Sequence, residues 1–420
     1  MLMRADSETK IAVFSHVHPS ISKGGAEISA YALYSGLKEL GYRVAFIAAC
    51  EARDRNRILV QTEDEHIVVC DPAQYDAFYH VAHPDVVEQV QRLVSSLGSN
   101  LLFFHHFLAF GLNTVGHLAE GMNVLVTFHE FLALCHNHGQ MITTQNGALC
   151  KQSHPARCTG CFPSIEPAQF SVRHAFIASM LTRVSSYISP SRFLMERFVQ
   201  SGFPQHKFHV IENGLLGAPA NAEAAADVYT RLEPSLPGNG APFVVGFFGQ
   251  LNPFKGLEII LEAAEHASRD PELNGRLVFR VHGRIVTLSD DLRVRLDRAV
   301  ANGTLEYRGP YDNVDVIKLM KECTYILMAS KWWENSPVVI QEAFLARRPL
   351  LVPDAGGMAE KVQQGVTGFR FRLGDPNDLL RVAKHAMGTD LSSFSFPQPV
   401  PAIQMAQSYL EVANGVQRFS

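Results

Sequence analysis

Short apolar runs separated by amphipathic stretches recur along the whole chain. In the first half, apolar runs predict buried strands at 10–16, 43–49, 101–104, 122–128 and 207–211. Between them, a period near 3.6 residues predicts helices at 26–40, 85–97, 113–120, 168–183 and 192–201. Apolar strands that alternate with helices are typical of a parallel sheet covered on both faces.

The same pattern starts again after a stretch rich in Ala, Pro and Gly at 217–241. Strands are predicted at 243–248, 276–281, 304–307, 325–329 and 350–352. Helices are predicted at 257–268, 291–302, 314–322, 338–346 and 358–363. A last amphipathic helix at 402–413 follows a proline-rich piece.

This pattern predicts an α/β chain with two Rossmann-like, doubly wound domains that face each other across a cleft. We place the N-terminal domain at 1–216, a linker at 217–241 and the C-terminal domain at 242–395. Residues 396–420 are expected to cross back to the N-terminal domain.

Composition narrows the class of protein. A length of 420 residues suits about two domains, and a net charge of −4 argues against nucleic acid as the main partner. No apolar run reaches the length of about 20 residues that spans a bilayer, and the polar start does not look like a secretory signal. Seven cysteines, an odd number, favour a reducing cytoplasm. Peripheral contact with the inner face of the membrane stays open.

Two carboxylates, Glu334 and Glu342, stand eight residues apart after the predicted strand 325–329. Ser336 and Pro337 between them suit the N-cap and the first position of a helix. The free N–H groups of that helix would face the crevice in which α/β sheets bind ligands, and they favour an anion. A ligand with a diphosphate between hydroxyl-bearing groups, such as a nucleotide sugar, fits this arrangement.

Two glycine-rich turns also follow predicted strands. Gly24 and Gly25 precede the first helix, where a ligand approach and an ordinary tight turn are both open. The loop 249–256 of the second domain ends on Lys255 and Gly256, and Lys255 suits a diphosphate. Solvent exposure is the alternative for that lysine.

Together these motifs resemble the retaining glycosyltransferases of family four, which have the two-domain GT-B fold. The matching pieces are Gly24-Gly25-Ala26-Glu27, His129, Asn213-Gly214, the loop 249–256, Glu334-x7-Glu342, Asp354-Ala355-Gly356-Gly357 with Glu360, and 365–369. They span most of the chain in the family's order.

The resemblance implies a role for each matching residue. His129, Glu334 and Lys255 would act in catalysis: His129 beside sugar and acceptor, Glu334 on the transferred sugar and Lys255 on the leaving diphosphate. The donor-binding residues would be Gly24, Gly25, Gln250, Lys255, Val338, Val339 and Glu342, with Glu342 on the ribose hydroxyls. The resemblance also implies transfer with retention. Lys255 and the helix terminus could stabilise the diphosphate without a catalytic metal, and no clear Asp-x-Asp motif marks a metal-dependent donor site.

For several of these residues the sequence allows an alternative interpretation. The family usually has Arg at the place of Gln250, so Arg284 or Lys331 would have to replace that cation, or activity is reduced or lost. His129 could instead be a satisfied structural histidine. Trp332 and Trp333 could stack on a sugar or anchor their loop.

Four cysteines, Cys135, Cys150, Cys158 and Cys161, fall within the loop-rich segment 130–167. The last two form a CxxC motif, and four thiolates in a cytosolic protein suit a structural zinc ion better than an iron–sulfur cluster. Free or redox-paired thiols are the alternative.

The leading hypothesis is therefore a retaining glycosyltransferase that moves a sugar from a nucleotide diphosphate sugar to a carbohydrate, glycolipid or other small acceptor. Bacterial polysaccharide or glycolipid synthesis is a role found in the family. A nucleotide-sugar epimerase, a phosphorylase, and a catalytically silent scaffold with a zinc-based interaction loop are the alternatives.

Overall fold

The structure is a computed structural model that describes residues 9–22, 24–60, 62–219 and 242–417. The chain divides into two compact units. The N-terminal unit consists of residues 1–220 together with 400–420, and the C-terminal unit of residues 221–399. Most of the linker expected at 217–241 lies outside the described residues.

The N-terminal unit contains one parallel sheet with the strand order β3-β2-β1-β4-β5-β6-β7. Its strands are β1 (Lys10–Ser15), β2 (Arg43–Cys50), β3 (Glu65–Val69), β4 (Leu101–Phe104), β5 (Asn123–Thr127), β6 (Ser186–Ser189) and β7 (Phe208–Val210). From β1 the strand order runs outward to β3 on one side and to β7 on the other, so the order switches between β1 and β4. The carboxyl ends of β1, β4 and β5 therefore lie side by side at one edge.

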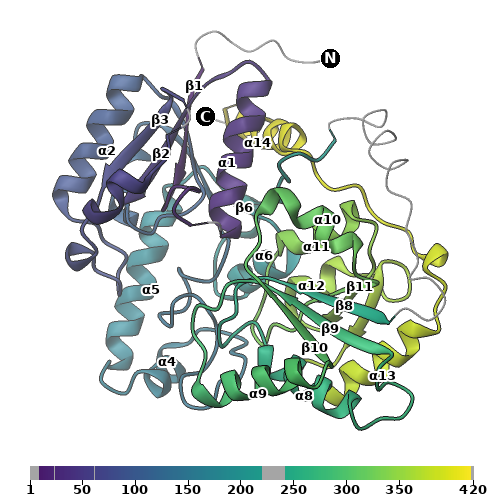
Figure 1. The fold of residues 1–420 in the computed structure, drawn as a ribbon. Helices are drawn as coiled ribbons and strands as arrows, with labels where there is room; N and C mark the ends of the chain where they lie inside the picture. Colours follow the sequence, from purple (N-terminus) through teal and green to yellow (C-terminus); the bar gives the residue numbers. More distant parts are fainter. Residues whose placement is uncertain (1–8, 23, 61, 220–241, 418–420) are drawn as a thin grey trace. The chain divides into compact units, whose positions relative to one another are not determined.

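Helices cover both faces of this sheet (Figure 1). They are α1 (Gly25–Glu39), α2 (Pro84–Leu97), α3 (Leu112–Leu118), α4 (Pro155–Cys161), α5 (Pro167–Thr182), α6 (Arg192–Gln200) and α14 (Ala402–Gln417). The α1 and α14 helices share one apolar cluster with the inner strands. The α2 and α5 helices lie on the other side of the sheet (Figure 1).

The C-terminal helix α14 packs directly on α1. Their backbones approach so closely that a Cβ atom at Gly36 would overlap the backbone of Ala402. Met405 and Tyr409 of α14 are buried, and the Tyr409 hydroxyl lies 2.9 Å from Oγ1 of Thr127. The helix α14 is thus part of the apolar core that packs against β4 and β5.

The C-terminal unit contains a second parallel sheet with the order β10-β9-β8-β11-β12-β13. Its strands are β8 (Phe243–Phe248), β9 (Leu277–His282), β10 (Leu305–Gly309), β11 (Tyr325–Leu327), β12 (Leu350–Pro353) and β13 (Gly368–Phe371). Its helices are α8 (Leu257–Ala267), α9 (Asp290–Ala301), α10 (Val316–Lys321), α11 (Val338–Leu345), α12 (Gly356–Lys361) and α13 (Pro376–Met387).

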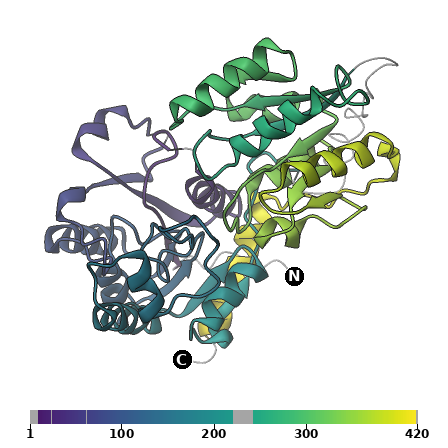
Figure 2. The same ribbon diagram turned by 90° about the horizontal axis from the view of Figure 1, so that it is seen from below.

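Alternate side chains of these strands enter two different apolar clusters. One cluster lies under α8, α9 and α13, and the other under α10, α11 and α12. Figures 1 and 2 show helices on both sides of these strands. Burial on both faces explains why the strands read as continuous apolar runs in the sequence.

The prediction of two Rossmann-like domains is confirmed, although several elements were missed. The strands β3 and β6 and the helix α13 had no counterpart in the sequence-based assignment, whereas β13 overlaps the piece 365–369 that resembles the family. The β6 strand carries serines at both ends, and β3 includes Glu65 and His66, so neither is an unbroken apolar run. The CxxC motif lies in the helix α4, which the sequence-based assignment also lacks.

Candidate functional site

Glu334 lies at the centre of a polar cluster in the C-terminal unit. Its Oε1 atom accepts hydrogen bonds from Lys255 Nζ at 2.6 Å, Ser330 Oγ at 2.7 Å and Trp332 Nε1 at 2.7 Å. The Glu334 residue is 9% exposed. Burial alone would raise its pKa, but the charge of Lys255 and the three hydrogen bonds lower the pKa below its usual value. Glu334 is therefore held as a carboxylate.

Two glycines allow the loops around this cluster to approach each other. Gly256, at the start of α8, has a φ of +75°, and a Cβ atom there would overlap the carbonyl oxygen of Ala329. A Cβ atom at Gly357 would overlap the carbonyl oxygen of Asn335. The N–H of Gly357 donates to the carbonyl oxygen of Glu334 at 2.6 Å. The backbone on both sides of Glu334 is thus fixed by positions at which only glycine fits.

The helix α11 begins immediately after this loop, with Val338 and Val339 as its first two residues. Pro337 has a ψ of 125° and is the N-cap, so the expectation that Ser336 is the N-cap and Pro337 the first helical residue was wrong by one position. An extended ψ cannot continue into the first helical turn. Within the part of the chain that the structure describes, the N-cap Pro337 has no side-chain hydrogen bond to the helix, and the first N–H groups of such a helix can bind a ligand anion.

Glu342, the fifth residue of α11, is 9% exposed. Burial raises the pKa of this carboxyl group to about 7. Burial, and after it the charge of Glu342, raises the pKa of Tyr311. Donated hydrogen bonds from ligand hydroxyl groups would offset the cost of burying this carboxylate. Glu334 and Glu342 therefore occupy different electrostatic environments, one paired with a cation and the other desolvated.

Gln250 stands on an exposed turn after β8 and supplies no positive charge. The loop that carries Arg284 packs against this turn, because the N–H of Leu251 donates to the carbonyl oxygen of Arg284 at 2.9 Å. The Arg284 residue is exposed. Lys331, by contrast, forms an ion pair with Glu258. Of the two cations expected to replace the missing arginine, Arg284 lies on the loop next to Gln250.

In the N-terminal unit, four histidines gather at the carboxyl ends of three neighbouring strands. His16 follows β1, and His105 and His106 follow β4. His129 lies two residues after β5. Only His129 was identified from the sequence, although the other three show the same signal, a histidine directly after an apolar strand.

Contacts link these histidines to each other and to the acidic side chains of Glu130 and Glu27. The rings of His16 and His106 lie 4.4 Å apart, and Nδ1 of His105 lies 3.0 Å from Nε2 of His129. His106 Nε2 lies 3.1 Å from Oε1 of Glu130. Burial lowers the pKa of all four histidines, to about 4 for His16 and His106 and about 3 for His105. The cluster is therefore neutral at physiological pH and provides hydrogen-bonding groups.

The glycine turn before α1 is connected to this cluster through Glu27. Gly24 is the N-cap of α1, and a Cβ atom there would crowd the Glu27 carboxylate. Glu27 Oε1 lies 3.7 Å from Nε2 of His16. A Cβ atom built at Gly25 would have no atom of another described residue within 4 Å, apart from its chain neighbours and its own helix backbone. The structure thus brings the Gly24–Glu27 motif and the histidine cluster together at one edge of the N-terminal sheet.

The four cysteines Cys135, Cys150, Cys158 and Cys161 are half-buried, and among the described residues they form no disulfide bond. Their charges influence one another, since Cys150 and Cys158 raise the pKa of Cys135, although burial is the larger cause. Among the described residues, no group of three or more His, Cys, Asp or Glu side chains is close enough to hold a metal ion.

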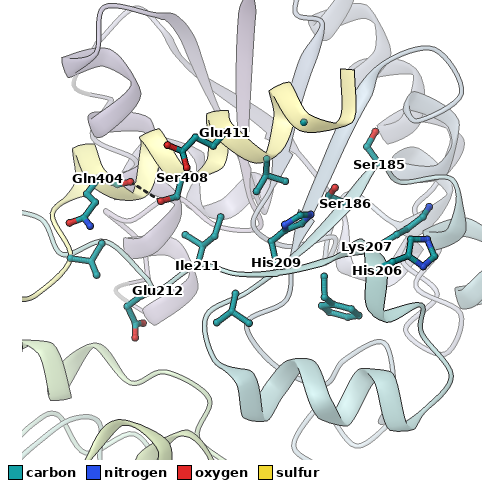
Figure 3. Close-up of a pocket in the computed structure, with 15 residues that line it drawn as sticks. Ser185, Ser186, His206, Lys207, His209, Ile211, Glu212, Gln404, Ser408 and Glu411 are labelled. Atoms are coloured by element: carbon teal, nitrogen blue, oxygen red, sulfur yellow. Dashed lines mark hydrogen bonds between the residues drawn. The ribbon is translucent and has the colours of Figure 1, made fainter. Parts of the chain in front are cut away.

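A groove lies elsewhere in the N-terminal unit, between the edge strand β7 and the helix α14 (Figure 3). It has a volume of about 1100 Å³. Its polar lining includes His206, His209, Gln404 and Glu411. None of the site residues expected from the sequence lines this groove.

Comparisons with known proteins agree with the two-domain fold. The family described as "Glycosyl transferase 4-like domain" matches residues 24–214, and the family "Glycosyl transferases group 1" matches residues 242–387. A search of curated protein sequences found no match. No helix of the described residues is long and apolar enough to cross a membrane.

Solved structures with the same fold cover nearly the whole chain. Anabaena Alr3699/HepE in complex with UDP and glucose is 18% identical, has a TM-score of 0.64, and is matched over 97% of this chain and 99% of its own. Sucrose-phosphate synthase from Thermosynechococcus elongatus is 16% identical, with a TM-score of 0.66 and coverage of 97% and 94%. The lipopolysaccharide outer core galactosyltransferase WaaB is 10% identical, with a TM-score of 0.64 and coverage of 97% and 99%.

The two family matches cover most of both sheets, with β1 and His16 outside them, and the fold is that of GT-B glycosyltransferases. Each domain thus matches a glycosyltransferase family model, and through both domains the chain is similar to the glycosyltransferases of the family-four type.

Proposed function

We propose that the chain is a retaining glycosyltransferase that transfers a sugar from a nucleoside diphosphate sugar to a hydroxyl group of a carbohydrate, glycolipid or other small acceptor. The observation that carries the proposal is the cluster of Glu334 with Lys255 at the start of α11, with Glu342 buried further along the same helix. It combines a cation, free helix N–H groups and two carboxylates, which suit a diphosphate with a sugar on each side.

In this proposal, Lys255 and the N–H groups of Val338 and Val339 stabilise the negative charge that develops on the leaving diphosphate. An ammonium group has three N–H donors, so Lys255 can bind a phosphate oxygen without leaving Glu334. The carboxylate of Glu334 favours the positive charge that develops at the sugar ring. Glu342 accepts hydrogen bonds from the ribose hydroxyls.

Retention requires that the acceptor oxygen bonds to the anomeric carbon on the face from which the diphosphate departs. The departing phosphate oxygen accepts the acceptor's proton, so the step needs no added base. His129 and the Gly24–Gly25 turn would bind the sugar and acceptor side. This chemistry relies on the chain's own charges and needs no catalytic metal.

The donor can be found by thermal stabilisation with UDP-, GDP- and TDP-sugars, followed by release of the nucleoside diphosphate with a panel of acceptor sugars. UDP-glucose is the first donor to test, because HepE was solved in complex with it. Stabilisation and transfer in the wild type, with no transfer by Glu334→Gln, would support the proposal. Sugar inversion without transfer would indicate an epimerase, and phosphate-dependent release a phosphorylase. Absence of binding by any donor would favour the silent scaffold.

We also propose that Cys135, Cys150, Cys158 and Cys161 bind a structural zinc ion. The CxxC spacing of Cys158 and Cys161 supports this, as does the placement of both on the short helix α4. A bound ion would fasten a long segment that has little core of its own. We place the protein in the cytoplasm, with peripheral contact at the inner membrane face, in polysaccharide or glycolipid synthesis.

A further inference from the structure

His129 is in hydrogen-bonding contact with a second, more deeply buried histidine, His105. His105 is fully buried, whereas His129 is only half-buried. The His105 Nδ1 and His129 Nε2 atoms lie 3.0 Å apart, and the two rings lie 5.2 Å apart at 26°. Since β4 and β5 are neighbouring strands, the ends of these strands fix both rings at this separation.

The C-terminal helix α14 holds His105 in turn. The rings of His105 and Tyr409 are nearly parallel, at 7°, with centroids 5.7 Å apart. Tyr409 is itself fixed by the hydrogen bond between its hydroxyl group and Oγ1 of Thr127, the last residue of β5. A chain of contacts therefore runs from His129 through His105 to a helix almost 300 residues further along the sequence.

The protons of this pair can be assigned by counting hydrogen-bond partners. Burial keeps both rings neutral, so each has a single N–H. The Nε2 atom of His105 is buried and has no hydrogen-bond partner among the described residues. A bare nitrogen in that place leaves only an acceptor unsatisfied, whereas an N–H there would be a buried donor without a partner, which is rarer in proteins. His105 therefore has its proton on Nδ1 and donates it to Nε2 of His129.

We propose that His105 is a positioning residue that holds His129 in one orientation and in the tautomer with the proton on Nδ1. Nε2 of His129 then accepts the hydrogen bond from His105, so it is not available to act as a base. His129 works as a neutral ring with its N–H fixed at Nδ1. The inference rests on the proposed role of His129 in the transfer reaction. Tyr409 supports the positioning residue, which gives the C-terminal helix an effect on the site.

The direct test is the ¹⁵N spectrum of histidine-labelled full-length protein, in which ring nitrogens with and without a proton have different shifts. The signals of His129 are identified by their loss in His129→Gln. We expect the Nδ1–H tautomer in the wild type and in His105→Asn, whose amide can still donate to His129. His105→Phe fills the space without a donor, and we expect it to lose this preference. An Nε2–H tautomer in the wild type, or an unchanged tautomer in His105→Phe, would overturn the inference.

Kinetics provide a second readout, with UDP release from the donor and acceptor pair found for the wild type. His105→Phe should lower kcat by about 10- to 100-fold with little change in the donor KM, and His105→Asn should restore most of it. Equal losses in both variants would indicate a merely structural role. The spectrum does not depend on turnover, so a wild type without transferase activity would refute the proposed function while the tautomer is still tested.

Discussion

The ammonium group of Lys255 lies 2.6 Å from Oε1 of Glu334, although the two residues are 79 positions apart in the chain. The contact joins the loop after β8 to the loop after β11, two strands that are neighbours in the sheet. It also explains how a nearly buried carboxylate stays ionised at the start of α11.

Loss of the Lys255 charge should weaken donor binding. Lys255→Met is expected to lower the affinity for UDP-glucose, or for the donor identified by screening, by about 10- to 100-fold, because a charge-assisted contact to phosphate is removed. Calorimetric titration measures this. Lys331→Met is the matched control, since Lys331 forms an ion pair with Glu258. Equal affinities in wild type and Lys255→Met would refute the assignment.

The same substitution should destabilise the protein. Without Lys255, Glu334 keeps two hydrogen-bond donors but loses its cation, at a cost of about 1–3 kcal/mol in the free energy of unfolding. Urea denaturation of Lys255→Met and of the double variant Lys255→Met/Glu334→Gln would show it. The double variant should recover part of the loss, because its residue 334 has no charge to stabilise. Failure to recover would mean that the ion pair is not the cause.

The buried carboxyl group of Glu342 should lower the free energy of unfolding as the pH rises, because it must ionise. Its folded-state pKa, about 7, is above the usual value of 4.5, so the folded protein binds this proton more tightly than the unfolded chain does. The free energy of unfolding is therefore unaffected below about pH 4.5 and falls until about pH 7, by up to about 3 kcal/mol.

Glu342→Gln lacks this penalty. Relative to the wild type, we expect it to gain about 2–3 kcal/mol in unfolding free energy between pH 5 and pH 8, and to lose donor binding. Denaturation at several pH values measures the first effect and titration with donor the second. A constant difference between the two proteins across this range would contradict the raised pKa.

Arg284 is expected to replace the cation that is missing at Gln250. Arg284→Ala should weaken donor binding by about 10-fold, and Gln250→Arg in that background should restore it, because a nearby positive charge is returned to the site. Lys331→Ala serves as the comparison, and binding constants for the four proteins decide between the two cations. A loss in Lys331→Ala with none in Arg284→Ala would reverse the assignment.

The cysteine segment can be tested by metal analysis. We expect about one zinc per chain in the wild type and none in Cys158→Ser/Cys161→Ser, because two thiolate ligands are removed together. Chelation of the wild type should lower its melting temperature to that of the variant. Cys323→Ser, which changes a buried cysteine of the C-terminal core, is the control and should keep its zinc. The same zinc content in all three proteins would rule out this site.

The sequence alone determined the fold class, because parallel sheets buried on both faces require apolar runs that alternate with helices, and this pattern is local. It also placed Glu334 before the start of a helix and Glu342 inside that helix, since the two residues are only eight positions apart and their separation is a local property of the chain. The serine-flanked β6 and the polar β3 were missed because only their neighbours in the sheet make them strands.

Only the tertiary structure decided which distant side chains meet. The pairing of Lys255 with Glu334 and the approach of the Arg284 loop to Gln250 depend on strand order in the C-terminal sheet. The gathering of His16, His105, His106 and His129 depends on the placement of β1, β4 and β5 side by side, and the contact of Tyr409 with His105 depends on the return of α14 to the first sheet. Periodicity reports which face of an element is buried, but the partner of that face is chosen by packing across the whole chain.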